Sequence, residues 1–185
     1  MVYVALLRGI NVGGNNKVEM SKLKETFNKL GMKEAKTYIN SGNVIFNDSA
    51  NSKQELENTI KKAIFQDFEI DIKVLVRDVG YFEKLLKVLP NSWRNDSEMK
   101  CDVLFLTDDL YENMLKEKIK INPQVDNIIY TRGAVIWAVD KKDVTKSHLV
   151  KLVGTDIYKN MTVRNVNTVR KIYGIMKINK DLEIQ

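Results

Sequence analysis

The sequence predicts an α+β fold made of two tandem ferredoxin-like (βαββαβ) units with extra helices and antiparallel sheets. Two observations lead to this prediction. The apolar patterns follow the order strand, helix, strand, strand, helix, strand in both halves of the 185-residue chain, which is the ferredoxin-like order. Apolar residues make up 44% of the chain, a proportion typical of folded globular proteins.

In the first half, the spacing of apolar residues predicts each element. Strands are expected over residues 2–7, 35–40, 43–47 and 70–76. Helices are expected over residues 20–30, 52–64 and 79–89. Ser52 and Glu55 form a capping box that begins the second helix, and Ser41-Gly42 is a two-residue hairpin turn.

The second half repeats the pattern with little residue identity to the first. Strands are expected over residues 102–106, 127–131, 134–139 and 161–164, and helices over residues 109–120, 147–153 and 168–177. Arg132-Gly133 is a second two-residue turn, and Asn167 is expected to cap the last helix. A polar stretch over 90–99 divides the chain into two domains, residues 1–92 and 93–185.

Several strands are apolar on both faces, as in residues 2–7 and 134–139. Such strands are covered on both faces, whereas the two helices of a ferredoxin-like unit cover only one. The second face is therefore expected to be covered by the extra helices, over 79–89 and 168–177, or by packing of the two sheets against each other.

Composition excludes several kinds of site. One Cys (Cys101) permits no internal disulfide and no Cys-based zinc cage, and one His (His148) permits no two-His metal site. No metal and no cofactor is expected, Cys101 is expected to be an idle thiol, and His148 a solvated or capping residue. No secretory signal or membrane span is recognised, so a cytoplasmic protein without membrane contact is expected. The sequence predicts no oligomeric state.

The first candidate ligand site combines a Gly/Asn-rich loop with a turn. Ferredoxin-like topology brings the loop over 8–16, the turn over 40–43 and the start of the first helix to the same edge of the sheet. Backbone amides, the helix dipole and a guanidinium can together bind an anion, and an Asn side chain can read a polar group beside it. The candidate residues are Arg8, Asn11, Gly13, Gly14, Asn40, Ser41, Gly42 and Asn43. Purely structural roles, as turn residues and a surface ion pair, are the alternative.

The second candidate is a basic, amide-rich cluster at the start of the last helix. It contains Arg164, Asn165, Asn167 and Arg170. Net charge is +6, and residues 141–180 carry ten basic and two acidic residues, so an anionic partner is expected near this cluster. A structural connection between strand and helix is the alternative.

Three motifs carry a resemblance to a known family. They are Leu-Arg-Gly-Ile-Asn-Val-Gly-Gly over 7–14, Thr-Tyr-Ile-Asn-Ser-Gly-Asn-Val-Ile-Phe over 37–46 and Thr-Val-Arg-Asn-Val-Asn-Thr-Val over 162–169. The chain resembles the bacterial family catalogued as domain of unknown function 1697. The resemblance implies the tandem ferredoxin-like architecture, and it implies no reaction and no catalytic residues.

Three functions follow from these observations. The first is a binding module for an anionic ligand, which is a nucleotide, a phosphorylated metabolite or nucleic acid. The second is a scaffold or interaction protein without a small-molecule site. The third is a small enzyme that acts on a phosphorylated or carboxylated metabolite and orients it with Arg8, Asn11, Ser41 and Asn43. The chain offers no clear acid–base pair, and no aromatic RNA-recognition signature is present.

Overall fold

The computed structural model describes residues 1–107 and 119–183. The predicted helix over 109–120 lies almost entirely outside this part. The chain groups into two compact units, one formed by Met1–Glu83 with Lys171–Gln185 and the other by Lys84–Arg170. Division into domains at residue 92 stays a prediction.

The first unit has the predicted ferredoxin-like topology. Its elements are β1 (Val2–Leu7), α1 (Met20–Lys29), β2 (Lys33–Tyr38), β3 (Asn43–Asn47), α2 (Lys53–Phe68) and β4 (Val74–Asp78). The sheet has the order β2-β3-β1-β4, and all the paired strands are antiparallel. This order is that of a βαββαβ unit, so the predicted fold class is confirmed.

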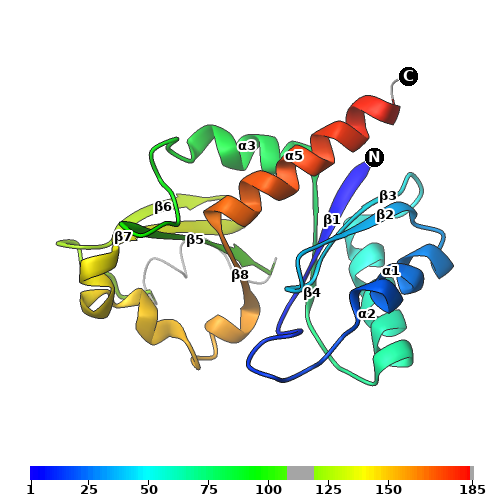
Figure 1. Ribbon diagram of the computed structural model, residues 1–185, viewed down its shortest axis with the longest axis horizontal. Coiled ribbons are helices and arrows are strands. Elements are labelled where there is room, and N and C mark those ends of the chain that lie inside the picture. Colours follow the sequence, from blue (N-terminus) through cyan, green and yellow to red (C-terminus); the bar gives the residue numbers. More distant parts are fainter. Residues whose placement is uncertain (108–118, 184–185) are drawn as a thin grey trace. The chain divides into compact units, whose positions relative to one another are not determined.

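Helices α1 and α2 lie on the same side of this sheet (Figure 1). The core between them and the sheet contains Phe27 of α1, Ile60 of α2 and Phe46 of β3, all fully buried. The predicted capping box begins α2, because the Ser52 hydroxyl accepts a hydrogen bond from the Glu55 amide (3.3 Å) and the Glu55 carboxylate accepts one from the Ser52 amide (2.8 Å).

The second face of the first sheet is also buried, as Val4, Ile45 and Leu75 show. Part of its cover is α5 (Val166–Glu183). Lys36 of β2 pairs in register with Ile45, and its Nζ donates a 2.8 Å hydrogen bond to Oδ1 of the fully buried Asn179 in α5. The C-terminal part of α5 therefore lies against this face, as expected for an extra helix.

The connection between β2 and β3 differs from the prediction. It has four residues, from Ile39 to Gly42, instead of the two-residue turn Ser41-Gly42. Ile39 has a φ of +50°, which is uncommon for a β-branched residue. Asn43 is fully buried, and its Nδ2 closes the turn by donating a 3.0 Å hydrogen bond to the Tyr38 carbonyl. The spacing of apolar residues does not reveal a side-chain hydrogen bond of this kind, so it could not predict the length of the turn.

The second unit repeats the sheet topology. Its strands are β5 (Met99–Leu106), β6 (Asn127–Thr131), β7 (Ala134–Asp140) and β8 (Met161–Asn165), in the order β6-β7-β5-β8 with antiparallel pairs. Strands β6 and β7 are joined by the predicted turn Arg132-Gly133. Helix α3 (Val79–Val88) follows β4, and α5 follows β8.

The crossover from β7 to β8 corrects a second prediction. It contains the short 3₁₀ segments η1 (Lys141–Lys146), η2 (Leu149–Leu152) and η3 (Tyr158–Asn160) instead of the helix expected over 147–153. Ser147 has an extended backbone (ψ 135°) and Val153 has a ψ of 125°, so the helical conformation is confined to the residues between them. The apolar spacing is therefore satisfied by one short turn, whose Leu149 and Leu152 join the core.

A four-residue sequence pattern occurs once in each unit, although the two halves of the sequence otherwise share little identity. Strand β4 enters α3 through Val-Arg-Asp-Val over 76–79, and β8 enters α5 through Val-Arg-Asn-Val over 163–166. In each copy the buried arginine donates from Nη1 to the carbonyl before it, at 2.9 Å for Arg77 and 2.8 Å for Arg164. In each copy the next side chain accepts from an amide three residues on, at 2.8 Å for Asp78 and 2.9 Å for Asn165.

Burial has different effects on two ionisable groups of the second unit. Burial lowers the pKa of Arg164 to about 10, which leaves it charged at neutral pH. Burial raises the pKa of the Cys101 thiol to about 12, with a further contribution from the charge of Asp102. Cys101 is fully buried and is a neutral thiol at pH 7, in line with the idle role expected from the sequence.

Gly42→Ala is expected to destabilise the protein more than Gly31→Ala. Both glycines have φ near +75°, so each alanine costs about 1–2 kcal/mol. Only at Gly42 does an added Cβ come within 2.8 Å of Leu7 and Ile10, which adds about 1–3 kcal/mol of overpacking. Urea unfolding followed by circular dichroism measures the difference, and equal losses of stability in the two variants would contradict the packing argument.

Cys101 is expected to resist alkylation in the folded protein. At pH 9 about half of an ordinary thiol is ionised, whereas a thiol with a pKa of about 12 is almost wholly neutral. Iodoacetamide should therefore modify the native protein more than about 100-fold more slowly than the urea-unfolded protein, as measured by mass spectrometry. Comparable rates in the two states would show that the thiol is reachable and ionised.

Candidate functional site

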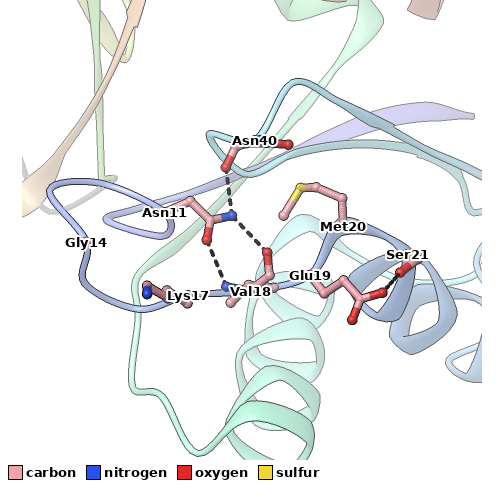
Figure 2. Close-up of a pocket in the computed structure, with 8 residues that line it drawn as sticks. All are labelled: Asn11, Gly14, Lys17, Val18, Glu19, Met20, Ser21 and Asn40. Atoms are coloured by element: carbon pink, nitrogen blue, oxygen red, sulfur yellow. Dashed lines mark hydrogen bonds between the residues drawn. The ribbon is translucent and has the colours of Figure 1, made fainter.

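A hollow of about 570 Å³ opens on the first unit where the loop from β1 to α1 meets the turn between β2 and β3. Figure 2 shows its lining, which consists of Asn11, Gly14, Lys17, Val18, Glu19, Met20, Ser21 and Asn40. All of these residues belong to the loop, the first turn of α1 or the β2–β3 turn. The hollow thus lies at the sheet edge where the sequence predicted a ligand site.

Asn11 holds the loop and the turn together. Its Nδ2 donates to the Val18 carbonyl (2.9 Å) and to the Asn40 carbonyl (3.0 Å), and its Oδ1 accepts from the Val18 amide (2.8 Å), as Figure 2 shows. These three bonds occupy both amide donors and one acceptor position. Asn11 therefore shapes the hollow, and its amide N–H groups are already used within the protein.

The Gly/Asn motif folds into a small hairpin. Val12 and Asn15 form an isolated antiparallel bridge around Gly13 and Gly14, which have φ of +59° and +80°. Positive φ at both central positions is the geometry of a type I′ turn and favours glycine. The side chain of Asn16 donates to the Gly9 carbonyl at 3.0 Å and closes the base of the loop. The two glycines are thus required by the turn.

The start of α1 forms another wall of the hollow. Glu19 is the N-cap residue, and its side chain makes no capping hydrogen bond. Its carboxylate instead accepts a hydrogen bond from the Ser21 hydroxyl and lies 3.8 Å from the Lys22 ammonium. The first turn contains no acidic residue, and Lys17 is exposed beside it. Backbone amides, the positive end of the helix dipole, one lysine and the Glu19 carboxylate thus border the same space.

The predicted residues divide into two groups. Asn11, Gly14 and Asn40 line the hollow. The other predicted residues do not line it: Arg8 and Gly13 of the loop, Ser41 and Gly42 of the turn, and Asn43 at the start of β3. The backbone amide of Arg8 donates to the Lys73 carbonyl at 3.0 Å. Sequence reasoning missed Lys17 and the residues up to Ser21. Their signal was their position around the beginning of the first helical stripe at Met20, which places them at a helix N-terminus.

The second predicted cluster is engaged with the segment that precedes β5. Arg170 donates to the carbonyls of Trp93 (2.7 Å) and Pro90 (3.0 Å), and Asn167 donates to the Asn95 carbonyl (2.8 Å). Arg164 also donates to the Thr162 hydroxyl at 3.2 Å.

The cap of α5 corrects a prediction. Asn165 accepts from the Thr168 amide at the position of the helix cap, whereas Asn167 lies within the first turn. Two asparagines two residues apart satisfy the same sequence signal, and Asn167 instead bonds to Asn95.

Among residues 1–107 and 119–183, no three His, Cys, Asp or Glu side chains are grouped so that they could hold a metal ion. His148 is half-buried at the start of η2, and its side chain makes no capping bond. No helix in the same part of the chain is long and apolar enough to cross a membrane.

Comparisons with known proteins agree with the fold. Residues 1–137 match the model of the family described as "Protein of unknown function (DUF1697)". The structure is similar to that of a conserved bacterial protein from Streptococcus pneumoniae, with a TM-score of 0.81, 28% sequence identity, and coverage of 95% of this chain and 98% of that one. No curated protein matches the chain. Since the family model covers more than half of the chain, the chain belongs to the DUF1697 family.

Proposed function

We propose that the first unit is a binding module for a phosphorylated small molecule, which it binds in the hollow beside α1. The observation that carries this proposal is the opening of the hollow onto a helix N-terminus without a side-chain cap, with Lys17 on its wall. A helix N-terminus presents N–H donors and a partial positive charge, and both favour phosphate.

The local backbone supports the proposal. Asn11, Asn16 and Ile39 are non-glycine residues with φ between +48° and +54°, and all three lie in the loop and turn that border the hollow. Such conformations cost free energy and concentrate at ligand clamps and active sites. The three bonds of Asn11 hold the loop in one arrangement, so a ligand would find its site already formed.

Size and surroundings favour a small molecule over nucleic acid. Small-molecule pockets have volumes of about 300–1,000 Å³, and the hollow lies in this range. Single-stranded RNA is commonly read on an open sheet face by stacking aromatic side chains. Here every residue of β1 and β3 is buried, so the central strands offer no such face.

Lys17→Ala is expected to weaken the binding of inorganic pyrophosphate and mononucleotides about tenfold, because one charge-assisted contact is lost. Isothermal titration calorimetry and the ligand-induced rise in melting temperature measure the effect. Lys24→Ala is the matched control, since Lys24 is an exposed lysine of α1 that does not line the hollow. It should change affinity less than about twofold.

Other outcomes would overturn the proposal. Equal losses in the two lysine variants would show that attraction is spread over the surface and is not located in the hollow. Tight binding of single-stranded oligonucleotides that falls steeply with salt would make nucleic acid the ligand. No thermal shift with pyrophosphate or any mononucleotide would leave the loop with a purely structural role and favour a scaffold protein.

A further inference from the structure

The second unit contains a pocket that is separate from the hollow. Its crossover from β7 to β8 consists of 3₁₀ segments, and between these segments and the sheet lies a cavity of about 210 Å³. Leu104 and Trp137 form part of the sheet side of the pocket, and Leu149 and Leu152 of η2 lie opposite. An engineered apolar cavity of about 150 Å³ binds benzene, so this pocket has room for one ring or a short aliphatic chain.

The mouth of the pocket is apolar and reaches the surface. Val150 and Val153 line the pocket, yet they are 43% and 66% exposed. A ligand that entered the pocket would remove their methyl groups from water, which is favourable at about 25 cal/mol per Å² of apolar surface.

The polar end of the pocket already holds an ammonium group. The Lys100 Nζ lies 3.1 Å from the Asp102 carboxylate and 5.6 Å from the centre of the Trp137 ring. The Asp102 side chain is 12% exposed, whereas the Lys100 side chain is 36% exposed. The indole N–H of Trp137 donates to Asp126 at 3.0 Å, which fixes the orientation of the ring. A largely buried carboxylate and an aromatic ring of fixed orientation thus lie side by side, and the cation reaches them on a partly exposed side chain.

We infer that this pocket binds a small organic ammonium ion that carries one ring or a short aliphatic chain. The ligand ammonium takes the place of the Lys100 ammonium beside Asp102 and over Trp137, and its apolar part fills the space lined by Leu104 and Val153. Carboxylate and aromatic face are the two groups that recognise organic cations. Lys100 then returns to water at little cost, because it is already partly exposed.

The charge of the pocket decides between an ammonium and a carboxylate ligand. A carboxylate would have to share the Lys100 ammonium with Asp102, and the two negative charges would repel each other in a poorly solvated site. An ammonium ligand brings the charge that Asp102 lacks once Lys100 has moved away.

The test uses the full chain and three probes of similar shape, 2-phenylethylammonium, 3-phenylpropanoate and neutral 2-phenylethanol. Binding is measured by calorimetry and by the NMR signals of the indole N–H groups of Trp137 and Trp93. We expect only the ammonium probe to bind well and to shift the Trp137 signal. Trp93 does not line the pocket and serves as the internal control.

Three variants separate the charges. Asp102→Asn should weaken 2-phenylethylammonium binding at least about tenfold, whereas Lys100→Ala should leave it unchanged or tighten it because the internal competitor is removed. Val153→Lys changes an exposed position and should weaken the ammonium probe by repulsion without affecting the fold. Preferred binding of the carboxylate probe, its loss in Lys100→Ala, or a Trp137 signal that does not move would overturn the inference.

Discussion

Burial of both faces of each sheet is the constraint on which the rest of the structure depends. Every residue of β1 is buried, and so are the last six residues of β5. A βαββαβ unit covers only one face with its own helices, so each sheet needs additional cover. In the first unit α5 supplies part of it through the contact between Lys36 and Asn179. The central strands of both sheets are almost wholly buried in the part of the chain that the structure describes, and the hollow lies at a sheet edge whereas the smaller pocket lies between the sheet and the β7–β8 crossover.

The buried arginines show how the edge strands meet the same constraint. Arg77 and Arg164 occupy equivalent positions, opposite Val4 in one sheet and Val103 in the other. Each places an aliphatic stem on the buried face and satisfies part of its guanidinium with the carbonyl of the preceding residue. Such an arrangement removes a polar group from water without leaving it unpaired, and it precedes the helix cap in both units. The cluster around Arg164 is basic in sequence, but its first arginine is a structural group.

Local signals in the sequence were reliable where one short segment determines the structure. The capping box at Ser52 and the turn Arg132-Gly133 are such cases. Prediction was wrong where a side-chain hydrogen bond selects among neighbouring residues, as with the β2–β3 turn, which Asn43 closes, and the cap of α5, which is Asn165 and not Asn167. The edge that contains the hollow followed from topology alone. The topology did not predict which residues line the hollow, because the hydrogen bonds of Asn11 and the exact start of α1 depend on three-dimensional contacts.

The grouping of residues 171–183 with residues 1–83 has a consequence for synthesis of the protein. At about 5–20 residues per second, a ribosome takes on the order of 5–20 seconds to make the segment between them. During that interval the face of the first sheet around Lys36 and Ile45 has to wait for its contact with α5. The first unit is thus completed only after the segment that forms the second unit has been made.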